Sequence, residues 1–303
     1  MFANIWKSLL TGVVTDDGSR GATAMPERFR GRPDLDPDRC DGCGDCVEAC
    51  PSRVIRTVPG SNDEVTLVTV DLAGCIFCGE CVPACGAGAF RMTQELELAS
   101  SSRDTLVMEA HLGEGEPPKT QAAPLRPPGP TLPVAPIGDV LRERIGELFG
   151  GSLHIREVSA GDCNACDLEV QATTNPIFDA SRFGIHFVAS PRHADMLLVT
   201  GPVSRNMAAA LVEAYNACPE PKLVVAVGAC AAAGGIFAES GQTMGGVDRV
   251  LPVNTYIPGC PPRPQAILHG ILMTIERERP HLQKLVKRRS TPLQKASTPS
   301  RPT

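Results

Sequence analysis

Cysteine is the residue type in this sequence whose number and spacing could do chemistry. The chain has 303 residues and 13 cysteines. Eight of the cysteines fall in two runs of one form, C-x-x-C-x-x-C-x-x-x-C. Such short, repeated intervals, in a sequence that shows no export signal, indicate metal ligation in a reducing compartment and not a disulfide framework. The runs are Cys40, Cys43, Cys46, Cys50 and then Cys75, Cys78, Cys81, Cys85.

Each run matches the bacterial ferredoxin pattern, in which three close thiolates bind one [4Fe–4S] cluster and the fourth binds the other. A structural zinc site is the alternative, but zinc uses paired knuckles that close one tetrahedron and does not call for two runs of four. Gly86 follows Cys85 where the pattern has proline, which affects one turn and not the ligands. The predicted ligand sets are Cys40, Cys43, Cys46 and Cys85 for cluster 1, and Cys50, Cys75, Cys78 and Cys81 for cluster 2.

Four more cysteines follow predicted strands in the second half of the chain. Because open α/β sheets bind ligands beyond the carboxyl ends of their strands, we expect these thiols to meet at one edge. Four thiolates are the number that a third [4Fe–4S] cluster requires, so an electron-transfer site is predicted. Cys218 is left over and is expected to be a buried structural thiol. The predicted third set is Cys163, Cys166, Cys230 and Cys260.

The elements that must position these thiols follow from the apolar patterning. Strands alternate with helices after residue 150, which predicts a parallel, doubly wound sheet of the α/β class. The first half should form an α+β domain around the duplicated runs. Predicted strands lie at 153–158, 184–189, 195–200, 222–228 and 250–257, and predicted helices at 166–173, 205–217 and 263–278.

Composition limits the functions open to the chain. The net charge of −5 gives no reason to expect nucleic-acid binding. No apolar stretch is long enough for a transmembrane helix, and the first ten residues lack a signal-peptide pattern, so we expect a cytoplasmic location.

The six histidines pair with no nucleophile at a recognisable spacing. Asp167 and Glu169 could relay protons, but acidic residues in a first helical turn more often complement the helix dipole. We therefore predict no catalytic residue.

Proline separates two halves. Eight prolines between Pro117 and Pro136 predict an extended polyproline tether. We expect the two domains to have separate cores and a shared partner to set the distance between them.

The expected divisions are an amphipathic lead-in at 1–30, a ferredoxin domain at 31–108, a linker at 109–136, an α/β domain at 137–279 and a disordered basic tail at 280–303. The lead-in could pack on a partner subunit or lie on a membrane surface.

The first domain resembles the two-cluster ferredoxin-type subunit of respiratory complex I and of formate hydrogenlyase. The resemblance rests on Arg28-Phe-Arg-Gly-Arg32, on Leu35-Asp-Pro-Asp-Arg-Cys40 and on the two cysteine runs. It covers about the first hundred residues.

The second domain resembles the small subunit of energy-converting [NiFe] hydrogenases and formate hydrogenlyase. The matching segments are Gly161-Asp-Cys-Asn-Ala-Cys166, Val225-Ala-Val-Gly-Ala-Cys230 and Tyr256-Ile-Pro-Gly-Cys-Pro-Pro262. The resemblance implies a flavodoxin-like fold with one cluster proximal to a partner's active site. In the related 20 kDa subunit of complex I the first two ligands are adjacent, whereas Asn164 and Ala165 separate them here, which favours the hydrogenase branch.

Together these resemblances imply a fusion of two electron carriers with three [4Fe–4S] clusters and no active site of its own. The implied partners are a large hydrogenase-like or complex-I-like catalytic subunit and the membrane-embedded subunits of the same complex, on the inner face of the cell membrane. A complex-I-type subunit that passes electrons to a quinone is the alternative function. A scaffold whose clusters only hold the fold together is a third.

Overall fold

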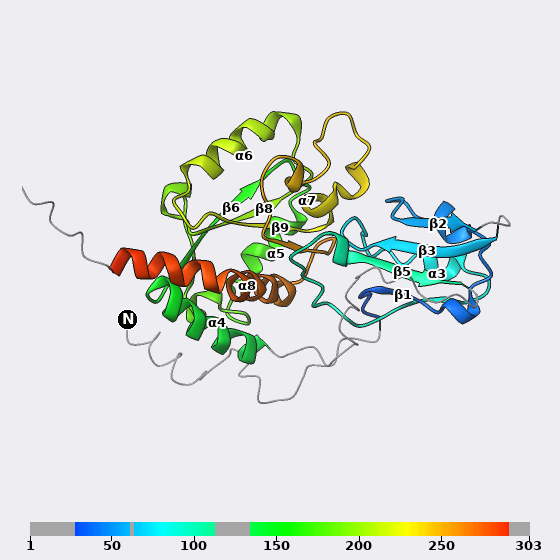
Figure 1. Ribbon diagram of the computed structural model, residues 1–303, viewed down its shortest axis with the longest axis horizontal. Coiled ribbons are helices and arrows are strands. Elements are labelled where there is room, and N and C mark those ends of the chain that lie inside the picture. The colour runs from blue at the N-terminus through cyan, green and yellow to red at the C-terminus, as the bar shows by residue number, and fades with distance from the viewer. Residues whose placement is uncertain (1–27, 61–63, 113–133, 291–303) are drawn as a thin grey trace, which may run out of the picture.

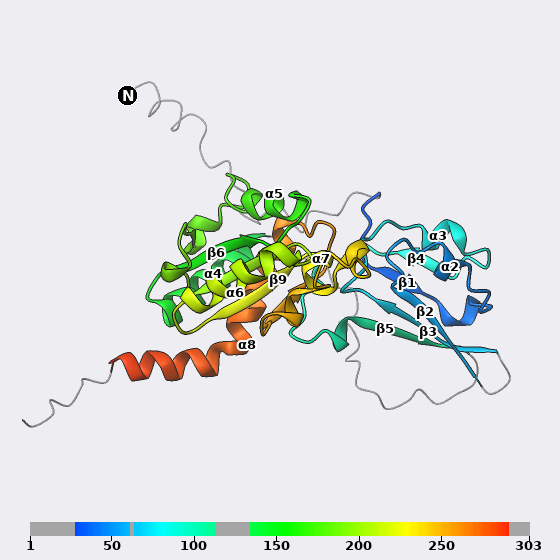
Figure 2. The same cartoon turned by 90° about the horizontal axis from the view of Figure 1, so that it is seen from above.

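The computed structural model describes residues 28–60, 64–112 and 134–290. The expected amphipathic pattern at 1–14 and nearly all of the proline-rich tether lie outside these residues. Figures 1 and 2 show two lobes that lie side by side, a small one built on short strands and a larger one with helices around a sheet. Among the described residues, no helix combines the length and apolarity needed to span a membrane.

The first lobe is built from two small antiparallel sheets. Strand β3 pairs with β2 on one side and β5 on the other, and β1 pairs with β4. Val68 and Val70 alternate with half-exposed residues along β3, so this strand has one buried face. The elements are β1 (Pro33–Leu35), α2 (Asp45–Glu48), β2 (Ile55–Pro59), β3 (Val65–Asp71), α3 (Cys81–Ala84), β4 (Phe90–Met92) and β5 (Val107–His111).

The second lobe has a five-stranded parallel sheet in the order β10-β9-β8-β6-β7. This is the order of a flavodoxin-like doubly wound sheet, so the predicted fold class is confirmed. Every residue of β8 and β9 is buried, as expected for central parallel strands covered on both faces. The strands are β6 (Leu153–Ser159), β7 (Ile185–Phe187), β8 (Met196–Thr200), β9 (Leu223–Val227) and β10 (Thr255–Ile257).

Helices cover both faces of this sheet (Figure 1). On one face, α4 and α8 bury Leu141 and Ile271 against Leu198. On the other face, α6 and α7 bury Leu211 and Ala231 together with the neighbouring strand positions. The helices are α4 (Val134–Phe149), α5 (Ala165–Ala172), α6 (Arg205–Ala217), α7 (Ala229–Ala233) and α8 (Pro264–Ser290).

Several predicted boundaries differ from the structure. Strand β5 runs past residue 108 to His111, and α4 begins at Val134 inside the predicted linker. Helix α8 continues past Pro280 to Ser290, where a disordered tail was expected. Packing accounts for the longer helix, because Leu282 is buried and Arg279 pairs with Glu147 of α4 at 3.1 Å, which offsets the backbone hydrogen bond lost at proline. Residues 291–303 lie outside the described part.

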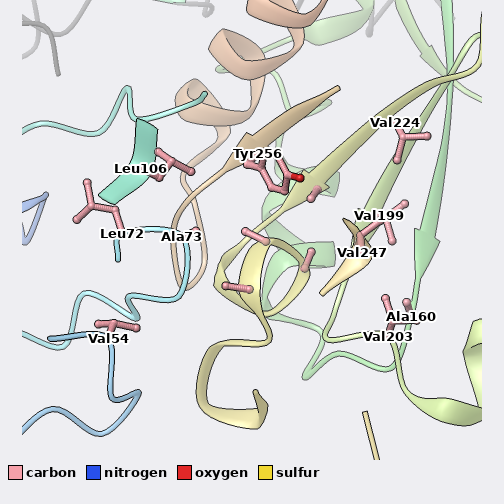
Figure 3. Close-up of a cluster of buried hydrophobic side chains, with 14 of the residues drawn as sticks. Val54, Leu72, Ala73, Leu106, Ala160, Val199, Val203, Val224, Val247 and Tyr256 are labelled. Carbon is pink, nitrogen blue, oxygen red and sulfur yellow. The ribbon is translucent and has the colours of Figure 1, made fainter. Parts of the chain in front are cut away.

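The expectation of separate cores was wrong. One buried cluster runs from Val54, Leu72 and Leu106 of the first lobe to Val247 and Tyr256 of the second. Figure 3 shows Leu72, Ala73 and Leu106 in the same cluster as Tyr256. The buried positions at the junction belong to loops and strand ends without periodicity, so the sequence pattern did not reveal them.

Polar contacts reinforce this junction. Ser100 and Tyr256 exchange backbone hydrogen bonds of 2.9 and 2.7 Å, which pairs the first lobe with the edge strand β10. Arg53 forms an ion pair with Glu239 at 2.7 Å across the lobes. The chain therefore sets the relative position of its lobes by itself, and a partner is not needed for this.

Candidate metal centres

The outer thiol group comprises Cys40, Cys43, Cys46 and Cys85. Cys40 follows a short 3₁₀ turn and donates its N–H to the Pro37 carbonyl at 3.2 Å. Gly44 begins α2 with a φ of 86°, a left-handed conformation that glycine adopts without strain. Burial, followed by the charges of Cys40, Cys43 and Cys85, raises the pKa of the Cys46 thiol to about 11. These four thiols are therefore close enough to interact, as predicted for cluster 1.

The inner thiol group comprises Cys50, Cys75, Cys78 and Cys81. Burial is the largest cause that raises the pKa of Cys75 to about 12, and the charges of Cys50, Cys81 and Cys78 add to it. The pKa of Cys81 is raised to about 12 by burial, then by Cys78 and Cys50, and also by Cys46 of the outer group. The crossed pairing predicted from the sequence, in which Cys50 joins the second run, agrees with these interactions.

Backbone N–H groups point at sulfur in both groups. Phe77 donates its N–H to Cys75 Sγ at 3.4 Å, and Ala89 donates to Cys85 Sγ at 3.2 Å. Such hydrogen bonds stabilise negative charge on sulfur and raise the reduction potential of an iron–sulfur cluster.

The sheet-end thiol group comprises Cys163, Cys166, Cys230 and Cys260. Each lies shortly beyond the carboxyl end of β6, β9 or β10, as predicted. Burial, followed by the charges of Cys260 and Cys163, raises the pKa of Cys230 to about 11. The pKa of Cys166 is also raised, by burial first and then by Cys230 and Cys260. Cys163 and Cys260 are exposed, whereas Cys166 is buried.

Two glycines of the segment 228–235 make room for these thiols. A Cβ on Gly228 would stand 2.5 Å from Cys166 Sγ, and φ at Gly228 is +90°. A Cβ on Gly235 would stand 3.1 Å from Cys230 Sγ. The backbone is therefore crowded around both thiols, more tightly at Cys166 than at Cys230.

The donor sets suit iron–sulfur clusters. The raised pKa values of Cys46, Cys75, Cys81 and Cys230 mean that these four thiols hold their protons at neutral pH until a metal displaces them. No three His, Cys, Asp or Glu side chains of the described residues surround the position of a single metal ion. In a [4Fe–4S] cluster each thiolate binds a different iron, so its four ligands need not converge as they do on one zinc ion.

Comparison with known proteins agrees with this division into lobes. Residues 39–89 match the 4Fe-4S dicluster domain, and residues 163–274 match the NADH ubiquinone oxidoreductase 20 kDa subunit. The chain is 45% identical over 150 residues to the probable membrane-bound hydrogenase subunit mbhJ of Pyrococcus furiosus. The aligned residues cover 48% of this chain and 87% of that protein. The chain belongs to the 20 kDa subunit family.

Two further relatives represent two kinds of oxidoreductase complex. Formate hydrogenlyase subunit 7 of Escherichia coli is 48% identical over 41% of this chain and 49% of its own length. An NADH-quinone oxidoreductase subunit of a Roseiflexus species is 47% identical over 37% of this chain and 42% of its own length. This member of the 20 kDa subunit family is thus an electron-transfer subunit of an oxidoreductase, with iron–sulfur clusters as its cofactors.

Three carboxylates lie behind the sheet-end thiol group. Asp167 accepts a hydrogen bond from Thr200 at 2.6 Å, and Asp162 accepts one from Ser159 at 2.9 Å. Burial, followed by the charge of Asp167, raises the pKa of Glu157 to about 7. Glu157 was not singled out from the sequence, although it continues the inward-facing positions Leu153 and Ile155 of β6, which was the available signal.

The remaining candidates have structural explanations. Cys218 is buried and donates its thiol hydrogen to the Ala194 carbonyl at 2.9 Å, which confirms a structural thiol. Glu169 lies near Arg263, whose charge opposes the effect of burial on the raised pKa of that carboxyl. Asp167 is held by Thr200, as described above. A proton relay through Asp167 and Glu169 stays a hypothesis.

Proposed function

We propose that the chain holds three [4Fe–4S] clusters and carries single electrons between its two lobes within a membrane-associated, hydrogenase-like complex. The division of twelve thiols into three interacting sets of four carries the proposal. When bound, each cluster supplies a site that is reduced and oxidised by one electron at a time. The proposed ligands are the outer, inner and sheet-end thiol groups defined above.

The residues of the chain bind the clusters and keep water away from part of each site. Cys46 and Cys166 are the buried members of their groups, and Phe77 and Ala89 donate N–H groups to sulfur. Low exposure and N–H···S bonds are the means by which proteins adjust the potential of such a site.

The inner and sheet-end groups face one another. Cys78 and Cys260 line the same cavity of about 680 Å³ between the lobes, together with Phe77 and the Pro258–Arg263 segment. No outer-group thiol lies among its described lining residues. Electron transfer between the lobes is therefore expected to cross at Cys78 and Cys260, which the junction core holds at a fixed separation.

The proposed partner is a large catalytic subunit that covers the sheet-end group. Cys163 and Cys260 are exposed there, and Leu168 and Ile177 on the same lobe are 57% and 55% exposed. Leu168 lies two residues after Cys166 in α5, and an exposed apolar side chain beside a redox site suits a protein interface. Membrane-embedded partner subunits are proposed because one relative is named a membrane-bound hydrogenase subunit, and a position on the inner face of the membrane is part of the same proposal.

Metal analysis tests the cluster assignment. We expect about twelve iron and about twelve sulfide per chain after anaerobic reconstitution, since three sets of four thiols each hold a four-iron cluster. Cys230→Ala should lose about a third of the iron and keep the clusters of the first lobe, as seen by electron paramagnetic resonance (EPR). Cys218→Ala is the matched control, and this variant should keep the full iron content. A count near eight in the unaltered chain, or zinc in place of iron, contradicts the proposal.

The quinone-linked alternative is supported by the similarity to the NADH-quinone oxidoreductase subunit of Roseiflexus. The two-residue interval between Cys163 and Cys166 favours the hydrogenase branch. The complex can be purified by an affinity tag on this chain and assayed in two ways, with hydrogen and a viologen dye or with a quinone. The two assays discriminate the hydrogenase-like function from the quinone-linked one. Nickel in the co-purified large subunit is expected, and quinone reduction without nickel would support the alternative.

A further inference from the structure

The outer thiol group has carboxylates beside it and one guanidinium group, that of Arg39, which donates a hydrogen bond to the Ala87 carbonyl at 3.2 Å. Asp41 Oδ1 accepts the N–H of Cys43 at 3.2 Å, and Asp45 stands between Cys43 and Cys46 in the sequence. Two negatively charged side chains thus lie beside this group, one of them hydrogen-bonded to the backbone of a proposed ligand.

The inner thiol group has a guanidinium group beside it, although Glu80 lies between Cys78 and Cys81 as Asp45 lies between Cys43 and Cys46. Arg30 donates a hydrogen bond from Nη1 to the carbonyl oxygen of Cys78. Its side chain also lies against the next residue, since a Cβ on Gly79 would stand 3.3 Å from Arg30 Cδ. Arg30 belongs to the lining of the 680 Å³ cavity that Cys78 and Cys260 share.

The rest of that cavity is also rich in guanidinium groups. Arg28 and Arg263 line it, and Arg263 stacks on the Phe29 ring with its guanidinium carbon 4.7 Å from the ring centre. Two carboxylates line it as well, Glu80 and Glu95, and Glu95 is already paired with Arg32 at 2.9 Å. Positive charge therefore prevails beside the inner group.

Charge of this kind changes how readily a cluster accepts an electron. One-electron reduction adds a negative charge to the cluster and its thiolates, so nearby cations raise the reduction potential and nearby anions lower it. Salt and solvent weaken the effect at exposed positions without changing its sign.

We propose that Arg30 is a positioning residue that makes the inner cluster the preferred electron site of the first lobe, while Asp41 and Asp45 disfavour reduction of the outer cluster. The proposal rests on the proposed cluster ligation. A first lobe that holds one electron would then hold it at the junction, next to the cavity that Cys260 enters. The charge asymmetry thus holds the electron ready to cross to the second lobe.

A redox titration of the full-length, reconstituted chain followed by EPR tests this. Signals are assigned with Cys43→Ala, which removes an outer ligand, and Cys78→Ala, which removes an inner one. We expect the inner signal to appear at the higher potential. Arg30→Gln should shift the inner midpoint to lower potential and leave the outer midpoint in place, and Arg30→Lys should restore most of the shift because it keeps the charge.

The outer group offers an independent test. Asp41→Asn combined with Asp45→Asn should raise the outer midpoint, and the amide that replaces the Asp41 carboxylate keeps an acceptor for the Cys43 N–H. Arg192→Gln is the matched control, because Arg192 is exposed and precedes β8 at the opposite end of the sheet from the thiols. Equal midpoints in the unaltered chain, or an outer signal that appears first, would overturn the proposal. Midpoints that respond to neither set of variants would also overturn the proposal.

Low iron in the unaltered chain would have a different meaning, because it would refute the ligand assignment and not the charge effect.

Discussion

The two lobes hold their thiols by different means. In the first lobe the thiols come from short runs of loop with two four-residue helices, and several of them pack against the buried core themselves. In the second lobe the thiols come from three strand ends that are distant in sequence, and a buried parallel sheet brings them together. The first arrangement makes the cluster part of the core, whereas in the second only Cys166 belongs to the core and the other three thiols lie at the edge of the sheet.

Removal of iron should show this difference with the largest effect. Because Cys50, Cys75 and Cys81 pack against its core, the first lobe should lose most of its structure when the metal is chelated. The parallel sheet should stay folded. Hydrogen exchange measures this as fast exchange in β2 and β3 with continued protection in β8 and β9. Equal protection of both lobes in the apoprotein would show that the metal is not part of the first core.

A cavity at the junction should affect both lobes together. Leu106 is fully buried in the cluster that spans them, so Leu106→Ala should cost roughly 2–5 kcal/mol of unfolding free energy. Leu141→Ala is the control, since Leu141 is equally buried but belongs to the other buried cluster, most of whose members lie in the second lobe. Denaturant unfolding followed by probes in each lobe measures both. If Leu106→Ala affects only the first lobe, the shared core is not cooperative.

The sheet-end group should be sensitive to one added methyl group. Gly228→Ala would put a carbon 2.5 Å from Cys166 Sγ at a backbone conformation that alanine disfavours. We expect a loss of about 2 kcal/mol in stability and selective loss of the sheet-end iron. Gly86→Ala is the control, because nothing lies within 4 Å of that Cβ position. Full iron in Gly228→Ala would mean that the loop can move aside.

The half-buried carboxylate of Glu157 in the second lobe predicts a smaller, pH-dependent effect. The pKa of Glu157 rises to about 7 in the fold, so the folded state binds the proton more tightly than the unfolded chain. This group favours folding most at low pH, and its contribution is lost as the pH rises from about 4.5 to about 7.

Glu157→Gln should therefore raise the melting temperature at pH 8 and change it less at pH 5.5. The expected gain is about 1 kcal/mol, because solvent screens a half-exposed group. Glu213→Gln, an exposed change on α6, is the control. An equal effect at both pH values would show that charge on Glu157 is not the cause.

The sequence predicted what depends on local spacing or on strand periodicity. The crossed pairing of Cys50 and Cys85 follows from the duplicated runs, and the parallel, doubly wound sheet follows from strands that alternate with helices. The flavodoxin-like fold was implied by the family resemblance. The junction could not be predicted, because Leu72 and Leu106 are apolar residues near strand ends whose burial depends on the other lobe. Glu157 was missed for a related reason, since its burial beside Asp167 depends on how β6 and α5 meet.

The pairing of Ser100 with Tyr256 also bears on solubility. Strand β10 is the outermost strand of the parallel sheet, and a bare outer strand offers free backbone groups to any other extended chain. The segment that carries Ser100 occupies part of this edge and bonds to it in both directions. The first lobe therefore shields the second from self-association through this edge. A second lobe produced alone would expose its edge and should aggregate more readily than the fused chain.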